Sequence, residues 1–266
     1  MISKLSEGGN VFKGPEKQPL TQRIATADVE ETILYIEKIT GLDFTKEKHL
    51  DDKKPVKWLG TTGRKEDPDG TFEKNSSGDL DLSVDANEVD KKSFAEKLIS
   101  QFGKENIKLS GDNVHWKVPI KGSPDNGFVQ ADFMFSANPK FQQGSMIGGQ
   151  GEYRGEHRHI LLSSIARARG IKYSPKHGIL NATTDELLPN GNDWNQIAKV
   201  LLGQTATVKD IKSVDAILDY IKKLPNYEEL VKDARDAFER DKLTLPEDAT
   251  LPGTGAWYRQ FLNKRI

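Results

Sequence analysis

Cysteine is absent from the 266 residues of the chain. This absence excludes disulfide bonds, thiol nucleophiles, iron–sulfur clusters and cysteine-based zinc sites, and it favours a reducing, intracellular setting. An excess of one charge is absent as well, since 39 Lys and Arg stand against 40 Asp and Glu, for a net charge of −1. A polybasic mode of nucleic-acid binding is therefore not expected, but the balanced charge does not exclude a groove in which basic residues cluster.

Long apolar runs are also missing. No segment approaches the roughly 18 apolar residues that a membrane helix needs. The first ten residues, MISKLSEGGN, lack the apolar centre of a signal peptide. We therefore expect a cytoplasmic, that is intracellular, protein with no membrane partner. The composition, with 30% charged and 35% hydrophobic residues, is that of a globular protein and not of a disordered chain.

The periodicity of apolar residues predicts an α+β protein in three parts. Residues 1–25 form a polar arm with little structure, residues 26–150 an α/β domain, and residues 151–266 a helical domain. The pattern predicts strands at 56–60, 79–84, 107–120 and 128–135, and helices at 28–41, 88–103, 157–170, 194–203, 207–224 and 225–243. The glycine-rich stretch 136–155 is expected to be a long loop.

The segment SGDLDLSV at 77–84 carries the main functional signal. Residues i and i+2 of a strand face the same side, so Asp79 and Asp81 project together while Leu80 and Leu82 enter the core. Two carboxylates held in this way are suited to a hard cation such as Mg²⁺ or Mn²⁺. A chain this acidic contains roughly six acid-x-acid pairs by chance. The flanking apolar alternation is what distinguishes this pair.

A third acidic residue and a small-residue turn strengthen this hypothesis. In FVQADFMF at 128–135 the alternation buries Val129 and its strand-mates and leaves Asp132 on the opposite face. If this strand lies beside the 79–84 strand, three carboxylates converge. The turn LGTTGR at 59–64 offers backbone N–H groups to a phosphate, and Arg64 adds positive charge.

In these residues the chain resembles the nucleotidyltransferases of the DNA polymerase β type. The elements of that signature are Leu59, Gly60, Thr61, Asp79, Asp81 and Asp132. Thr61 stands where the family has Gly or Ser, and the spacer before the first aspartate is longer than in the family. The resemblance implies a mixed β-sheet domain with flanking helices, followed by a helical C-terminal domain.

The resemblance also implies a reaction, in which an NMP passes from an NTP to an acceptor hydroxyl and pyrophosphate leaves. Asp79 and Asp81 would bind two Mg²⁺ or Mn²⁺ ions, with Asp132 sharing one ion and accepting the proton of the hydroxyl. The residues expected to bind the nucleotide are Gly60, Thr61, Thr62, Arg64, Ser77, Arg158, Ser164 and Lys172. The acceptor stays open between RNA, protein, a small molecule and a nucleotide, as does the oligomeric state.

Two other functions fit the same residues. The chain could be a catalytically silent relative used for binding or assembly, or a metal-dependent phosphohydrolase or nuclease built on the acidic cluster. His115, between Val114 and Trp116, is read as a strand residue without a catalytic role. Tyr173 and Trp194 are read as core residues or as platforms for a base.

Overall fold

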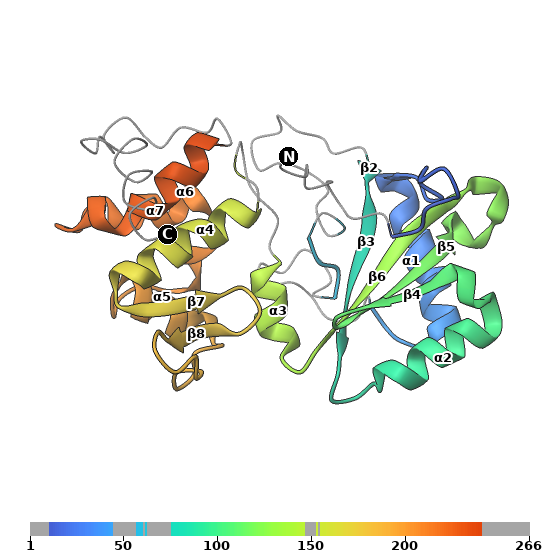
Figure 1. Cartoon of the computed structure of the whole chain (residues 1–266), viewed down its shortest axis with the longest axis horizontal. Coiled ribbons are helices and arrows are strands. Elements are labelled where there is room, and N and C mark those ends of the chain that lie inside the picture. The colour runs from blue at the N-terminus through green and yellow to red at the C-terminus, as the bar shows by residue number, and fades with distance from the viewer. Residues whose placement is uncertain are drawn as a thin grey trace. The chain divides into compact units, whose positions relative to one another are not determined.

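A computed structural model describes residues 11–44, 57–60, 62, 76–146, 153 and 155–240 of the chain. The chain divides into two compact units, Met1–Met146 and Ile147–Ile266, and the sequence placed the change of texture near residue 150. Both units contain helices and strands, so the described part of the chain is of the expected mixed α+β class (Figure 1).

A four-stranded mixed sheet organises the N-terminal unit. Its strands lie in the order β3 (Asp79–Asp85), β6 (Phe128–Ser136), β5 (Asn113–Pro119) and β4 (Ile107–Ser110). β3 runs parallel to β6, and the other two pairings are antiparallel. β5 and β6 form an antiparallel hairpin. The single strand expected at 107–120 is wrong, because a turn at Gly111, with φ +48°, splits it into β4 and β5.

Two amphipathic helices, α1 (Thr26–Thr40) and α2 (Lys91–Phe102), cover one face of this sheet. α2 begins at Asp90, whose side chain accepts a hydrogen bond from the Ser93 N–H at 2.8 Å, and ends at Gly103. α1 ends at Gly41 in the left-handed conformation, as predicted. It begins at Thr26, two residues before the expected start at residue 28. The buried side chains of the two helices and the sheet are Ile33, Ile36, Phe94, Leu98, Leu80, Leu82, Val114, Trp116, Val118, Val129, Ala131 and Phe133.

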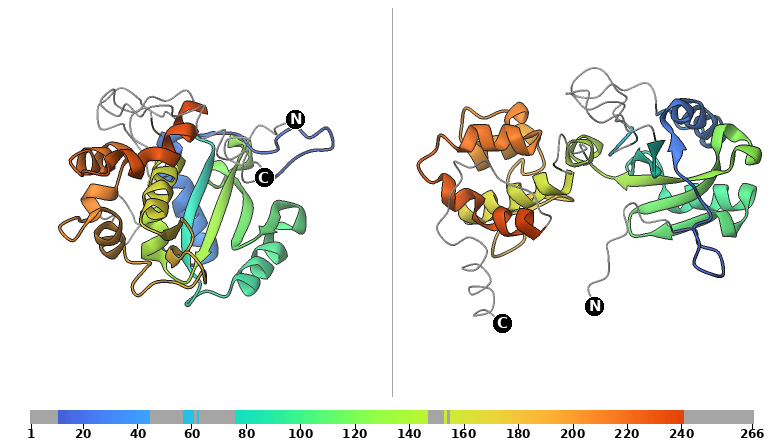
Figure 2. Two further views of the ribbon diagram at one scale, coloured as in Figure 1. Left: turned by 60° about the vertical axis from the view of Figure 1, so that its left-hand side comes forward. Right: turned by 90° about the horizontal axis from the view of Figure 1, so that it is seen from above.

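The described part of the expected N-terminal arm, residues 11–25, contains little regular secondary structure but packs against the rest of its unit. Phe12 and Ile24 are 1% and 0% exposed. β1 (Ile24–Ala25) pairs antiparallel with β2 (Ser76–Ser77). The Gln22 N–H donates to the carbonyl of Phe128 at 2.8 Å, and Figure 2 shows the segment running across the strands. Residues 1–10 lie outside the described residues.

Two other local expectations differ from the structure. Within the glycine-rich stretch, α3 (Pro139–Ser145) forms behind Asn138, whose side chain accepts from the Phe141 N–H at 3.0 Å. The strand expected at 56–60 is reduced, in its described part, to isolated bridge residues, and one of them, Trp58, pairs antiparallel with Leu82. A short segment around Trp58 therefore lies alongside β3, on the edge away from β6.

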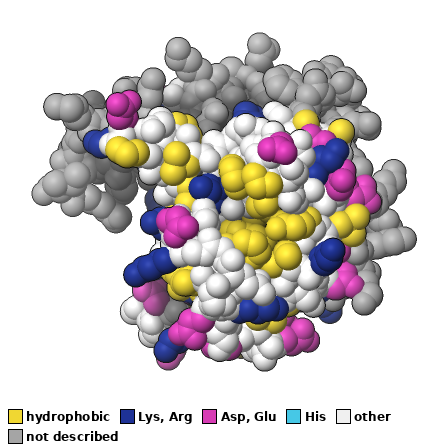
Figure 3. Space-filling model, turned by 90° about the vertical axis from the view of Figure 1, so that its right-hand side faces the viewer, with side chains coloured by type: hydrophobic (Ala, Val, Ile, Leu, Met, Phe, Trp, Pro, Cys, Tyr) yellow, Lys and Arg dark blue, Asp and Glu magenta, His cyan; other side chains and the backbone are white. Residues whose placement is uncertain are grey.

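One face of the N-terminal unit shows apolar side chains gathered among charged ones (Figure 3). Leu34 and Leu109 are 51% and 52% exposed. Tyr35 and Phe102 are partly buried, and both rings contact the ring of Trp116, at centroid distances of 6.2 and 4.6 Å. The two helices thus leave part of the core near water.

The C-terminal unit contains α4 (Gly155–Ala168), β7 (Ile171–Ser174), β8 (Gly178–Asn181), α5 (Trp194–Leu202), α6 (Val214–Ile221) and α7 (Tyr227–Arg240). The β7–β8 hairpin was not predicted. The helix expected at 207–224 is two elements, because a capping box of Thr207 and Asp210 starts only the 3₁₀ turn η4 (Val208–Ile211), and Ser213 then caps α6.

The other described 3₁₀ turns are η1 (Lys104–Asn106), η2 (Ile120–Gly122) and η3 (Pro124–Asn126). None of the described helices combines the length and the apolar stretch required to cross a lipid bilayer.

Candidate metal centre

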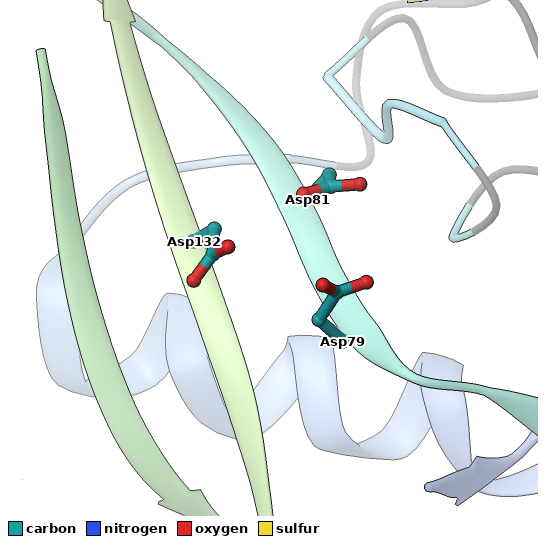
Figure 4. A group of neighbouring side chains, drawn as sticks. All are labelled: Asp79, Asp81 and Asp132. Carbon is teal, nitrogen blue, oxygen red and sulfur yellow. The ribbon is translucent and has the colours of Figure 1, made fainter. Parts of the chain in front are cut away.

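Three carboxylates meet on the face of the sheet opposite α1. β3 supplies Asp79 and Asp81, and β6 supplies Asp132, which stands directly across from Asp81 in the parallel register. Figure 4 shows all three side chains projecting from the same side of the two strands, with the helix behind the sheet. One oxygen of each carboxylate lies within 4.8 Å of the others. The convergence expected from the sequence is confirmed.

The cluster is electrostatically unfavourable without a cation. Asp132 is 8% exposed, and Asp79 and Asp81 are partly buried. The pKa of Asp81 is raised well above its usual value of 3.8, first by burial and then by the charges of Asp79 and Asp132. Burial and like charges both disfavour the ionised form. A bound cation would reverse this penalty.

The donor set fits a hard divalent cation. All three groups offer carboxylate oxygens, the ligands that Mg²⁺ and related ions prefer. Two oxygens bound to one ion at 2.0–2.6 Å lie at most about 4–5 Å apart. The observed spacing therefore needs little rearrangement to hold one ion, or two that share a ligand.

The predicted glycine turn lies beside Asp81. The Leu59 N–H donates to the carbonyl of Asp81 at 2.8 Å, and the Asp81 N–H donates to Thr62 Oγ1 at 2.7 Å. Gly60 has φ +51°, and a Cβ there would lie 2.8 Å from Asp81 Oδ2. Only glycine therefore fits against this carboxylate without displacement.

The Gly60 N–H is already used within the protein, since it donates to the carbonyl of Met146 at 3.0 Å. The role that the structure gives to Gly60 is to let the turn lie close to Asp81. Thr61 and Arg64, predicted to bind the nucleotide, lie outside the described residues. Ser77 directs its hydroxyl to the carbonyl of Asp79 at 2.7 Å, at the start of β3.

The other predicted nucleotide-binding residues belong to the C-terminal unit. Ser164 is buried, donates to the carbonyl of Leu230 at 2.8 Å and accepts from the Asp233 N–H at 3.1 Å, so it joins α4 to α7. Lys172 is exposed and pairs with Asp185 at 2.6 Å. Their binding of a nucleotide stays a prediction.

Arg158 is 3% exposed. Its guanidinium lies over the ring of Trp194, 5.0 Å from the centroid, and reaches the carbonyl of Lys212 at 3.4 Å. Burial lowers the pKa of Arg158, against an opposing effect of Tyr173. The hydroxyl of Tyr173 also lies 2.9 Å from His159 Nδ1. These contacts give Arg158 a packing role in its own unit, and its predicted binding of a nucleotide stays a prediction.

Sequence reasoning missed two neighbours of Asp132. His115 Nδ1 lies 2.7 Å from Asp132 Oδ1, and Gln130 Nε2 donates to Asp132 Oδ2 at 3.1 Å. The available signal was the hairpin register, which places His115 directly across from Asp132. The register depends on the conformation of the turn at residues 120–127, so it could not be worked out from the sequence.

Comparisons of the chain with protein-family models, with curated proteins and with solved structures found no match. Assignment of a function therefore rests on the geometry of the site.

Proposed function

We propose that the chain is a divalent-metal-dependent nucleotidyltransferase that transfers an NMP from an NTP to an acceptor hydroxyl and releases pyrophosphate. The observation that carries the proposal is the position of Asp79, Asp81 and Asp132 on two adjacent parallel strands, with oxygens within 4.8 Å. The glycine turn at Asp81 adds support. In this proposal the N-terminal unit is a polymerase β-type domain and the C-terminal unit its helical partner domain.

The chemistry of the cluster matches this reaction. Asp79 and Asp81 would hold two Mg²⁺ or Mn²⁺ ions, and Asp132 would share one of them. Such ions lower the pKa of an attacking hydroxyl and stabilise the negative charge of the leaving group. Asp132 lies directly opposite Asp81 on the neighbouring strand β6, and it accepts the proton of the acceptor hydroxyl. The Leu59 N–H and the Thr62 hydroxyl, which bond the carbonyl and the N–H of Asp81, keep its main chain in place.

Pyrophosphate release tests the proposal. The purified protein is incubated with each labelled NTP, Mg²⁺ or Mn²⁺, and RNA, protein, small-molecule and nucleotide acceptors. We expect transfer for the wild type and a loss of at least about 100-fold for Asp79→Asn and Asp81→Asn, because each removes a metal ligand. Asp85→Asn is the matched control, since Asp85 lies on the same strand outside the cluster and keeps its acceptor oxygen for Asn87.

The products separate the alternatives. Release of phosphate or nucleic-acid fragments by the wild type, but not by the same two variants, would show that the protein catalyses hydrolysis and not transfer. Nucleotide binding without either product would identify a catalytically silent module. Equal transfer by wild type and Asp81→Asn would contradict the assignment of the cluster.

A further inference from the structure

Asp132 is held by the protein at both of its carboxylate oxygens. His115 Nδ1 contacts Oδ1 at 2.7 Å, and Gln130 Nε2 contacts Oδ2 at 3.1 Å. His115 and Gln130 are 4% and 2% exposed. Both side chains come from the face of the sheet that carries the cluster, one from β5 and one from β6 itself.

The outer partners fix which atoms donate. The Val11 N–H donates to Gln130 Oε1 at 2.9 Å, so the amide must present its N–H₂ to Asp132. An ionised carboxylate only accepts, so the proton of the contact with His115 sits on Nδ1. Nε2 then faces the hydroxyl of Ser110 at 2.6 Å. Each oxygen of Asp132 thus receives one hydrogen bond and keeps lone-pair capacity for a cation.

We propose that His115 and Gln130 are positioning residues that fix the carboxylate of Asp132 as a metal ligand. The inference rests on the proposed function, because it requires that Asp132 binds the cation. A buried carboxylate with free rotation would lose conformational entropy on binding the metal, and two donors at 2.7 and 3.1 Å remove that freedom in advance. Gln130 also ties the site to the N-terminal segment through Val11.

The connection Ser110–His115–Asp132 has the order of a nucleophilic triad. Two observations favour the positioning role. Asp132 belongs at the same time to the carboxylate cluster, and its second oxygen is held by Gln130, which a triad does not require. Ser110 serves as the outer partner that orients the imidazole.

A near-isosteric pair of variants tests the proposal. In Asn the amide N–H takes the place of Nδ1–H, whereas Leu has a similar shape and no donor. Binding of Mn²⁺ alone to the full chain is measured from the EPR signal of the free ion. We expect His115→Leu to weaken binding by about 10–100-fold, the usual effect of removing a partner of a metal ligand. We expect His115→Asn to stay within about threefold of wild type.

Further variants keep the test decisive if His115→Leu does not fold. Gln130→Met removes the second donor at similar size and is expected to weaken Mn²⁺ binding by the same order. Leu109→Asn is the control, because Leu109 is exposed and points to the other face of the sheet. Circular dichroism and the melting temperature establish folding for each variant.

The outcomes are distinct. Unchanged Mn²⁺ binding in His115→Leu and Gln130→Met overturns the inference alone, as does a His115→Asn variant as weak as His115→Leu. Absence of Mn²⁺ binding by the wild type overturns both proposals. If Mn²⁺ binding shows the expected differences between variants but no pyrophosphate is released, only the proposed transferase activity is overturned. Covalent labelling of Ser110 by a fluorophosphonate would replace the positioning role by a nucleophilic triad.

Discussion

Replacement of Asp81 by Asn should make the metal-free protein more stable and at the same time remove its response to divalent cations. Asp81 is the member of the cluster whose pKa is raised by burial, by Asp79 and by Asp132. Asn has nearly the same shape and carries no charge. The substitution therefore removes the repulsion while leaving the packing of β3 in place.

The separation of the oxygens sets the scale of the effect. Two unit charges 4.8 Å apart repel by about 3 kcal/mol at an effective dielectric constant of about 20. Asp79 and Asp81 are partly exposed, so water and salt screen part of this energy. We expect Asp81→Asn to raise the free energy of unfolding by about 1–3 kcal/mol in EDTA at pH 7.

Denaturant unfolding with and without Mg²⁺ or Mn²⁺ is the assay. A cation at 100 times its dissociation constant adds about 2.7 kcal/mol to the wild type. Asp81→Asn should show little of this gain. Asp85→Asn, the control on the same strand, should behave as wild type in both conditions.

The pH dependence has a defined sign. A carboxyl whose pKa is raised in the folded state carries no penalty below its unfolded pKa of 3.8, where it is protonated in both states. Above pH 3.8 the unfolded state ionises while the folded state still holds the proton, so the metal-free wild type loses stability until Asp81 is ionised in both states. The difference between wild type and Asp81→Asn should therefore close near pH 4 and open toward pH 7.

A destabilised metal-free Asp81→Asn protein would refute the reasoning, because it would mean that the charge of Asp81 contributes a net attraction. A full cation response in Asp81→Asn would equally exclude this carboxylate as a ligand.

Three further variants probe the surroundings of the site. Gly60→Ala should lose most of the cation response, because the new Cβ would lie 2.8 Å from Asp81 Oδ2, and thermal shifts with Mn²⁺ measure this loss. Thr62→Val should lower stability by about 1 kcal/mol through loss of the acceptor for the Asp81 N–H, whereas Thr62→Ser should restore it in urea unfolding; equal stability of Val and Ser would contradict this. Phe133→Ala removes a fully buried ring whose centroid lies 4.9 Å from that of Phe94, and it should lower the free energy of unfolding by about 3–5 kcal/mol without changing the three carboxylates.

The core of the site was predictable from local alternation. The apolar residues Leu80, Leu82 and Val84 fix the face of β3, and the same parity argument places Asp132 on the opposite side of β6 from Phe133. Alternation carries this information because successive side chains of a strand face opposite sides. The pairing of β3 with β6 was a hypothesis that the structure confirms.

Contacts between strands were less accessible. His115 was read only from its neighbours along the chain, while its partners Ser110 and Asp132 depend on the registers of two hairpins. The packing of Phe12 was missed because a polar segment with one aromatic residue has no periodicity. The β7–β8 hairpin was missed because its four-residue strands, in a region of helices, give too little alternation to recognise.

The register of β3 and β6 also has a consequence for folding. β3 is joined to its parallel neighbour through α2, β4 and β5, so the pairing closes late along the chain. A shift by one residue would turn Asp79, Asp81 and Asp85 toward the apolar core and move Leu80 and Leu82 to the polar face that carries the carboxylates. The carboxylates that repel one another in the native sheet therefore penalise the misaligned sheet far more heavily. The charged side chains of β3 therefore also favour its native alignment with β6.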